Sequence, residues 1–263
     1  MSTAGLEVEG GVGKQFPAPY LAVEGISHAF AERGDGRFVL SDISFTVARG
    51  EFVCLLGQSG CGKTTLLNIL AGFLTPTSGR CLLEGRAING PGPDRGVVFQ
   101  EDALFPWLTL RENIAFGLKA IPGGGQRATE VDRFLGLVGL DGYGDYLPRQ
   151  ISGGMKQRAA LARVLIRSPR MLLMDEPFGA LDAQSRETSQ ELLQNLALGR
   201  EQTILFITHD VREAVTLADR VLVLGRQSQG LCGEEPILLP RPRDPDGEMF
   251  HTYCRRLRER LRG

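Results

Sequence analysis

An α/β fold built on a parallel sheet is predicted by two observations. Short apolar runs alternate with segments of helical pattern over most of the 263 residues. One run, residues 52–56, leads into a glycine-rich segment, and a helical pattern follows it over residues 65–71. That segment, Gly57-Gln58-Ser59-Gly60-Cys61-Gly62-Lys63-Thr64, matches G-x-x-x-x-G-K-[ST]. Because strand, loop and helix occur in the order that phosphate-binding loops require, the sequence predicts a P-loop nucleotide-binding protein.

The elements follow in chain order. Residues 1–19 are rich in Gly and Pro, and we expect them to be flexible. Residues 20–27 and 38–47 have the pattern of antiparallel strands joined by a polar turn, Gly34-Asp35-Gly36, and residues 81–83 add another strand. The expected parallel strands are residues 52–56, 96–99, 171–174, 203–207 and 221–224. Helices are expected over residues 109–119, 129–138 and 154–167, with a glycine-rich break at residues 121–125.

Bulk properties narrow the class of protein. A net charge of −1 gives no argument for a nucleic-acid partner. No apolar run approaches the roughly 18 residues of a membrane span, and the N-terminus has no signal-peptide pattern. The five cysteines form no C-x-x-C pair, which argues against a metal centre or a disulfide framework. We therefore expect a cytosolic chain whose membrane role, if any, needs a separate partner.

The glycine-rich loop predicts its own chemistry. Glycines allow successive backbone N–H groups to point at one anion, with the N-terminus of the helix that includes Thr65 behind them. Lys63 is expected to reach the β- and γ-phosphates, and Thr64 to ligate Mg²⁺. Asp175 ends another apolar run, so its carboxylate is expected at the same edge of the sheet, where it suits a Mg²⁺ ligand.

Further motifs follow in a fixed order. They are Ser152-Gly153-Gly154, the pair Asp175-Glu176, the segment Gly179-Ala180-Leu181-Asp182, and Thr208-His209-Asp210 after a further apolar run. From about residue 21 to residue 224 this order resembles the ATP-binding cassette of ABC transporters. The signature motif departs from the common L-S-G-G-Q at Ile151 and Met155. The resemblance implies an ABC ATPase with a RecA-like core, an antiparallel β subdomain and a helical subdomain. It places the cassette at residues 20–240 and the helical subdomain at about residues 103–167.

The resemblance also implies roles for single residues. Glu176 resembles the catalytic carboxylate that orients or deprotonates the attacking water. His209 matches the switch histidine at the γ-phosphate, and Gln100 matches the glutamine that reaches Mg²⁺ and the water. Phe30 is expected to stack on adenine, and Phe38 is the competing candidate.

Ser152, Gly153 and Gly154 are expected to serve ATP bound by another copy of the chain. In relatives the signature motif lies far from the phosphate loop of its own chain. The resemblance therefore implies a head-to-tail dimer with ATP between the two copies, and Asp182 resembles the residue that connects the two sites.

Three classes of function compete: the energy subunit of a membrane importer, a soluble cassette ATPase, and a P-loop kinase or GTPase. The signature and Thr208-His209-Asp210 argue against the third class. Neither a second cassette nor a coiled-coil insertion is present, which argues against the second. We therefore expect an importer subunit peripheral to the cytoplasmic face of the membrane. Its expected partners are separate permease subunits and, indirectly, an extracytoplasmic substrate-binding protein.

The cargo is suggested by resemblance alone. Residues 85–100 are similar to taurine-import ATPases, and residues 104–109 fit the taurine, sulfonate and nitrate group, as does Met155. Taurine is the expected cargo, with alkanesulfonates and nitrate as alternatives. Phe105 and Trp107 are interpreted either as a contact for the permease or as core of the helical subdomain.

The chain ends in a predicted basic helix within residues 241–263. Phe250, Tyr253, Leu257 and Leu261 form one stripe, and arginines fill the other positions. Such a helix either docks on its own domain or lies on anionic lipid. We favour docking because the apolar stripe is narrow.

Overall fold

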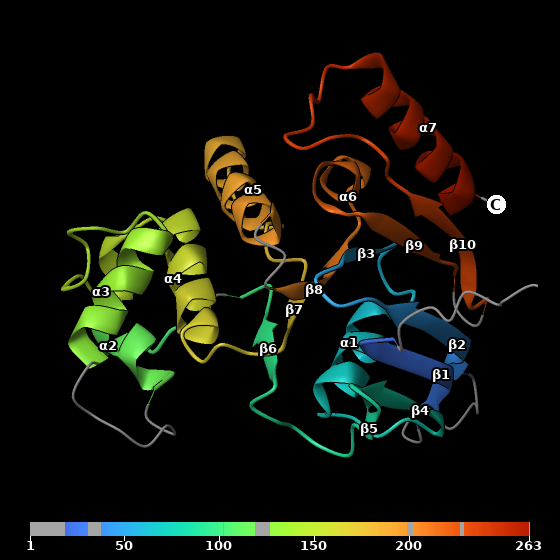
Figure 1. The fold of residues 1–263 in the computed structure, drawn as a ribbon, viewed down its shortest axis with the longest axis horizontal. Helices are drawn as coiled ribbons and strands as arrows, with labels where there is room; N and C mark the ends of the chain where they lie inside the picture. Colours follow the sequence, from blue (N-terminus) through green and yellow to red (C-terminus); the bar gives the residue numbers. More distant parts are fainter. Residues whose placement is uncertain are drawn as a thin grey trace, which may run out of the picture.

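The computed structural model describes residues 19–30, 38–101, 103–118, 127–198, 202–226 and 229–262. Its centre is a six-stranded sheet in the order β10-β9-β3-β8-β7-β6 (Figure 1). The strands from β9 to β6 are parallel, and β10 pairs antiparallel with β9 at one edge. The bounds are β3 Phe52–Gly57, β6 Arg95–Val98, β7 Met171–Asp175, β8 Thr203–Thr208, β9 Arg220–Leu224 and β10 Leu231–Pro236.

Burial on both faces explains why the central strands are continuous apolar runs. Every residue of β3, β7 and β8 is buried. Parallel strands covered by helices on both sides need apolar residues at every position, whereas a strand with one wet face alternates. The carboxyl ends of β3, β7 and β8 therefore lie beside one another, and each is followed by one of the motifs singled out in the sequence.

A second sheet of four antiparallel strands has the order β2-β1-β4-β5. It lies below the first sheet in Figure 1, with helix α1 (Lys63–Ala71) beside it. One apolar cluster joins the inner faces of both sheets and includes Leu21, Leu40, Leu55 and Leu66. The strand bounds are β1 Leu21–Ala29, β2 Phe38–Val47, β4 Ser78–Leu83 and β5 Arg86–Ala87.

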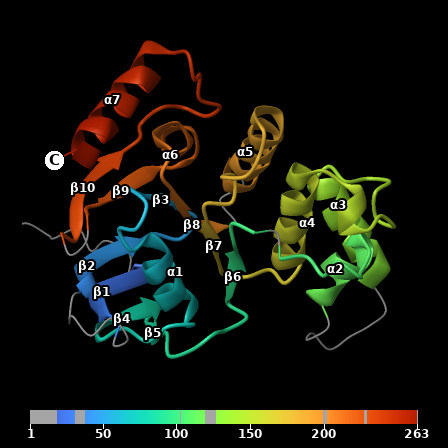
Figure 2. The ribbon, with the colours of Figure 1, turned by 180° about the vertical axis from the view of Figure 1, so that it is seen from behind.

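A group of helices forms a separate body at the far end of the molecule, seen from both sides in Figures 1 and 2. It consists of α2 (Leu110–Phe116), α3 (Arg127–Leu137) and α4 (Gly153–Leu165), with a short 3-10 helix, Pro148–Gln150. Helix α2 begins with a capping box: the Thr109 side chain accepts from the backbone N–H of Glu112, and the Glu112 carboxylate accepts from the N–H of Thr109. The RecA-like core, the antiparallel β subdomain and the helical subdomain are all present.

The C-terminal helix α7 (Glu248–Arg262) docks on the core beside α6 (Val211–Leu217). Phe250, Tyr253 and Leu257 are buried, and Leu261 is partly buried. Two arginines of α7, Arg256 and Arg260, pair with Glu235 of β10. Docking is thus the arrangement observed for the apolar stripe.

The predicted elements recur in the structure, with bounds that shift by a few residues. Five elements were not predicted: β5, β10, α6, the 3-10 helix Pro148–Gln150 and the helix α5, Ala183–Leu198. The turn Gly34-Asp35-Gly36, the break at residues 121–125 and most of residues 1–19 lie outside the described residues, and the predicted domain bounds stay predictions. Among the helices of the described residues, none has the length and apolar character needed to cross a membrane.

Candidate nucleotide-binding site

The phosphate-binding loop connects β3 to α1 and exposes backbone rather than side chains. Gly60 and Gly62 adopt left-handed conformations, with φ of 80° and 103°. A Cβ atom on Gly62 would lie 2.8 Å from Leu40 Cδ2, so the position requires glycine for space as well as for conformation. The Cys61 side chain is buried beneath the loop, and burial raises the pKa of its thiol. An anion above this loop would therefore meet N–H groups at the start of α1.

Lys63 is held at the floor of the site. Its ammonium group donates to the carbonyls of Gly57 and Gln58, at 2.9 and 3.1 Å. It also lies 3.2 Å from Glu176 Oε1, and its side chain is only 4% exposed. A buried cation needs partners of this kind, because an unpaired ammonium in the interior is costly.

Asp175 ends β7 beside Thr64. Its Oδ1 atom is buried and has no hydrogen-bond partner among the described residues. Burial raises the pKa of the Asp175 carboxyl, and the Thr64 hydroxyl acts in the opposite direction. The buried carboxylate oxygen without a partner, the Thr64 hydroxyl bonded to Asp175, and Gln100 in the lining of the same pocket form a set of oxygen donors that suits Mg²⁺.

The Glu176 carboxylate lies between the side chains of Lys63 and His209. Its Oε2 atom is 2.7 Å from His209 Nδ1, and its Oε1 atom faces Lys63. The residue has φ of 42°, a conformation that costs energy for any residue with a side chain. Its backbone N–H donates to the carbonyl of Ile207 on β8, which secures this conformation. The carboxylate thus occupies a position between two groups that could also hold a phosphate.

A pocket of about 490 Å³ gathers these groups, a volume within the range typical of small-molecule sites. Phe30 lies in its lining, whereas Phe38 does not, and Val39 is a lining residue that was not predicted. Gly57, Gln58, Cys61 and His209 are not in its lining, and the Gln58 amide instead donates to the carbonyl of Leu261 on α7. The lining residues are Phe30, Val39, Ser59, Gly60, Gly62, Lys63, Thr64, Thr65, Gln100, Asp175 and Glu176.

The signature residues are not brought to this pocket. Ser152 caps α4, and its hydroxyl accepts from the N–H of Met155 at 3.3 Å. Ser152 and Gly153 are exposed, whereas Gly154 packs against α5, where an added Cβ would lie 2.6 Å from Ser185 Cβ. Asp182 accepts from the N–H of Ser185 at the start of α5, and that bond lowers its pKa.

A buried carboxylate near the site was missed by sequence reasoning. Glu213 on α6 is 6% exposed and accepts a 2.6 Å hydrogen bond from the Thr208 hydroxyl, next to His209. A glutamate in the first turn of a helix is ordinarily read as an exposed charge that favours the helix N-terminus. The three-residue spacing between Asp210 and Glu213 does not indicate that the Glu213 side chain is buried.

Comparisons with known proteins agree with this geometry. A profile of the ABC transporter family matches residues 40–179. A taurine import ATP-binding protein of Pelagibacter ubique is 50% identical over 193 residues, 73% of each chain. A nitrate import ATP-binding protein of Synechococcus elongatus is 44% identical over 229 residues, 85% of this chain and 35% of the relative. A bicarbonate transport ATP-binding protein of the same organism is 44% identical over 248 residues, 92% of this chain and 37% of the relative.

Solved structures give the same result. A dimeric, post-hydrolysis ATP-binding cassette bound to ADP and phosphate superposes with a TM-score of 0.73 at 28% identity, covering 84% of this chain and 100% of that one. A subunit of an ABC transporter complex from Clostridium perfringens superposes with a TM-score of 0.75 at 28% identity, covering 83% of this chain and 89% of that one. The P-loop pocket, the separate signature helix and these likenesses together show that the chain belongs to the ABC transporter family, among its ATP-binding proteins.

Proposed function

We propose that this chain binds and hydrolyses ATP as the energy-coupling subunit of a membrane importer. The observation that carries the proposal is one pocket that collects Lys63, Thr64, Asp175, Glu176 and Gln100 from three separate motifs. A phosphate loop alone binds nucleotide, whereas a carboxylate beside it can also accept a proton from water.

The residues of the pocket have separate roles in binding and hydrolysis. The N–H groups of the loop and Lys63 bind the β- and γ-phosphates. Glu176 accepts the proton of the attacking water, and His209 holds the Glu176 carboxylate through its 2.7 Å contact. Phe30 supports the adenine ring, since it lines the pocket and Phe38 does not.

Thr64, Asp175 and Gln100 would hold Mg²⁺, which neutralises charge on the phosphates when bound. The buried Asp175 Oδ1 atom without a partner is the observation that supports this assignment. The oxygen ligands of these three side chains match the preference of a hard cation.

We further propose that two copies act together, head to tail. The exposed N-terminus of α4, with Ser152 and Gly153, is not in the lining of the chain's own pocket, and it is suited to bind the phosphate of ATP held by a second copy. The similar cassette of known structure is dimeric, which supports the pairing of two copies. Asp182 lies at the start of α5 and is proposed to connect the two sites.

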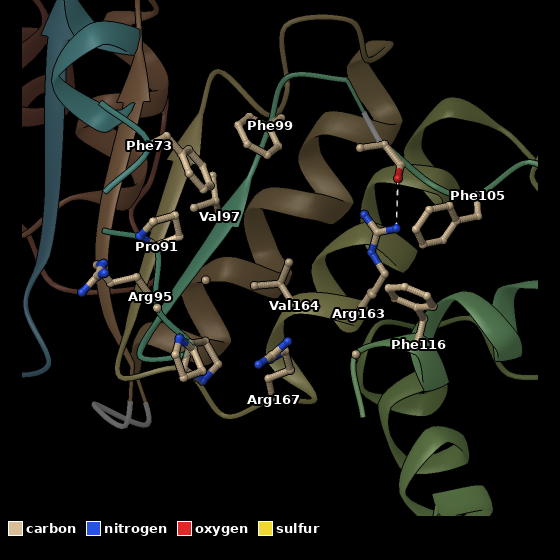
Figure 3. A pocket seen from close by; sticks show the side chains of 16 residues that line it. Phe73, Pro91, Arg95, Val97, Phe99, Phe105, Phe116, Arg163, Val164 and Arg167 are labelled. Atoms are coloured by element: carbon tan, nitrogen blue, oxygen red, sulfur yellow. Dashed lines mark hydrogen bonds between the residues drawn. The ribbon is translucent and has the colours of Figure 1, made fainter. Parts of the chain in front are cut away.

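A second pocket is proposed as the docking place of a separate permease. It has a volume of about 710 Å³ and lies between the helical body and the core, as Figure 3 shows. Phe105 and Phe116 meet on one side, with ring centroids 4.6 Å apart, and Phe73 and Phe99 stack on the other at 6.2 Å. Phe99 precedes Gln100, so the groove and the nucleotide pocket share one short segment.

Trp107 differs from Phe105 in its position. It is 72% exposed and is not in the lining of the groove, although its ring centroid lies 5.6 Å from that of Phe105. Trp107 is therefore not core of the helical body, and we propose that it contacts the permease at the rim. A subunit held in this way would be peripheral to the membrane, on its cytoplasmic face, with a substrate-binding protein acting on the opposite side.

Taurine is the cargo that we propose, with alkanesulfonates and nitrate as alternatives. The support is the similarity of residues 85–100 to taurine-import ATPases, the fit of residues 104–109 to the taurine, sulfonate and nitrate group, and the 50% identity to the Pelagibacter ubique protein. The nitrate and bicarbonate relatives are 44% identical to this chain, so sequence identity alone separates taurine only weakly from these competing cargoes.

Growth of a strain lacking the gene tests both parts of the proposal. We expect loss of growth on taurine as sole sulfur source, unchanged growth on sulfate, and restoration by the wild-type gene but not by Glu176→Gln. Loss of nitrate assimilation with retained use of taurine would contradict the cargo and leave the ATPase assignment intact. Restoration by Glu176→Gln would contradict the assignment of hydrolysis to this pocket.

A further inference from the structure

Two loops that the proposed function uses follow the neighbouring strands β8 and β7. One carries His209 and joins β8 to α6, and the other carries Asp182 and leads into α5. Neither Asp182 nor His209 is in the lining of the nucleotide pocket, although Glu176 at the start of the Asp182 loop is. Besides the direct contact of Glu176 with His209, a second set of contacts joins the two loops through buried side chains.

Glu213 anchors the loop that carries His209. Its Oε2 atom accepts from the Thr208 hydroxyl at 2.6 Å, and that hydroxyl accepts from the N–H of Asp210 at 2.9 Å. The residues on both sides of His209 are thus tied to one buried carboxylate. Burial raises the pKa of the Glu213 carboxyl, and its bond from Thr208 opposes that shift.

Arg186 anchors the loop that carries Asp182. Its guanidinium group donates to the carbonyl of Leu181 at 3.0 Å, and its backbone N–H donates to the carbonyl of Asp182 at 3.0 Å. Its Nε atom lies 3.7 Å from Glu213 Oε1. Arg186 Nε is buried and has no hydrogen-bond partner among the described residues, so Glu213 is the charge that compensates it.

We propose that Glu213 and Arg186 are positioning residues that link the Asp182 loop to the His209 loop. The chain of contacts runs from Leu181 through Arg186, Glu213 and Thr208 to His209. The inference rests on the proposed function, because the Asp182 loop matters only if a second copy faces it. A movement of that loop on dimer closure would then change the position of His209 against Glu176. Such a link couples the occupancy of one site to hydrolysis at the other.

Two substitutions remove the link from opposite ends. Glu213→Gln keeps an oxygen for the Thr208 hydroxyl but removes the charge opposite Arg186. Arg186→Met removes the cation, and Arg186→Lys keeps the charge without the planar group that also binds Leu181. The matched controls are Glu191→Gln, an exposed glutamate on α5, and Arg133→Met, which removes an exposed ion pair with Glu130.

The experiment measures ATP affinity and the dependence of the hydrolysis rate on ATP concentration for the purified full-length subunit. For Glu213→Gln and Arg186→Met we expect ATP affinity within about twofold of wild type, a rate lowered about tenfold, and a Hill coefficient reduced towards one. Arg186→Lys should recover part of both, and the controls should match wild type. The double variant should be no slower than either single variant, because both remove the same interaction.

Additive losses in the double variant, or a Hill coefficient equal to that of wild type, would overturn the inference. If Glu213→Gln fails to fold, the two Arg186 variants decide the question, since the Arg186 side chain is 35% exposed and Glu213 stays in place. Absence of cooperative hydrolysis in the wild-type protein would instead overturn the proposed dimer and this inference with it.

Discussion

The phosphate loop and the signature segment share one local structure but differ in the functional groups that surround them. Each is a glycine-containing turn at the N-terminus of a helix. The α1 terminus, capped by Gly62 without a side-chain bond, begins with Lys63 and shares a pocket of about 490 Å³ with Asp175 and Glu176. The α4 terminus is exposed, and the Ser152 hydroxyl accepts from the N–H of Met155 in its own helix.

The difference shows what a helix N-terminus can do alone. Backbone N–H groups attract an anion at either place, but only the first place has groups that bind metal and accept a proton. The second place is not in the lining of the pocket that holds Asp175 and Glu176. A chain with one complete site and one incomplete site of matching chemistry is suited to pair head to tail with itself.

The largest expected effect concerns the complete site. Glu176→Gln should lower the rate of ATP hydrolysis about 10³-fold, because the amide cannot accept the proton of water. ATP affinity should be retained, since the variant also removes the carboxylate that competes for Lys63. Rate and affinity are measured by phosphate release and by equilibrium titration. Hydrolysis close to that of wild type would show that another group is the proton acceptor.

The next effect concerns the incomplete site. Gly153→Asp should lower hydrolysis about 100-fold, because it places a negative charge where a second copy's phosphate is expected. An added Cβ at Gly153 meets only Leu181 Cδ2 at 3.9 Å, so the monomer has room for the side chain. ATP affinity of the monomer should be unchanged.

Gly154→Ala gives the control for space at the same turn. Its Cβ would lie 2.6 Å from Ser185 Cβ, so this variant should lower the free energy of unfolding by about 1–3 kcal/mol, measured by denaturant titration. Equal loss of stability for Gly153→Asp would mean that the exposed turn is structural rather than a binding surface.

A smaller effect is expected in binding. Lys63→Ala should weaken ATP binding about 30-fold, because charge-assisted bonds to the phosphates are lost. Arg133→Ala, which removes an exposed ion pair, is the control and should leave ATP affinity unchanged. Isothermal titration measures both. If Lys63→Ala bound ATP as tightly as the control, the phosphates would have to lie elsewhere.

The smallest effect separates the two aromatic candidates. Phe30→Ala should weaken ATP binding about fivefold, the loss expected for one stacking contact. Phe38→Ala should leave it unchanged, because Phe38 is not in the pocket lining. Inorganic tripolyphosphate should bind both variants equally, since it has no base to stack. The reverse order of the two variants would assign the base to Phe38.

The sequence predicted those parts whose physics is local. A continuous apolar run predicts a buried parallel strand, and the loop motif fixes its own glycines, as at Gly62. Strand β10 was missed because Gly233, Glu234 and Pro236 disfavour strands. It forms through its pairing with β9, while Glu235 pairs with the arginines of α7.

The functional site likewise contains residues that the sequence predicted and residues that it did not. The sequence identified Lys63, Asp175 and Glu176 because each belongs to a short motif. It gave no sign of the Glu213 contacts, whose partners Thr208 and Arg186 come from separate segments. Nor could it choose between Phe30 and Phe38, because the choice depends on which side chain reaches the pocket lining.

The central claim is that one site is complete in each chain and the other needs a second copy. Light scattering with quantitation of bound nucleotide tests it directly, using Glu176→Gln to prevent hydrolysis. With ATP and Mg²⁺ that variant should be a dimer. Adding Gly153→Asp should give a monomer that still carries ATP, and adding Lys63→Ala should give a monomer that carries little. A Glu176→Gln/Gly153→Asp protein that lost ATP as fully as Glu176→Gln/Lys63→Ala would contradict the account.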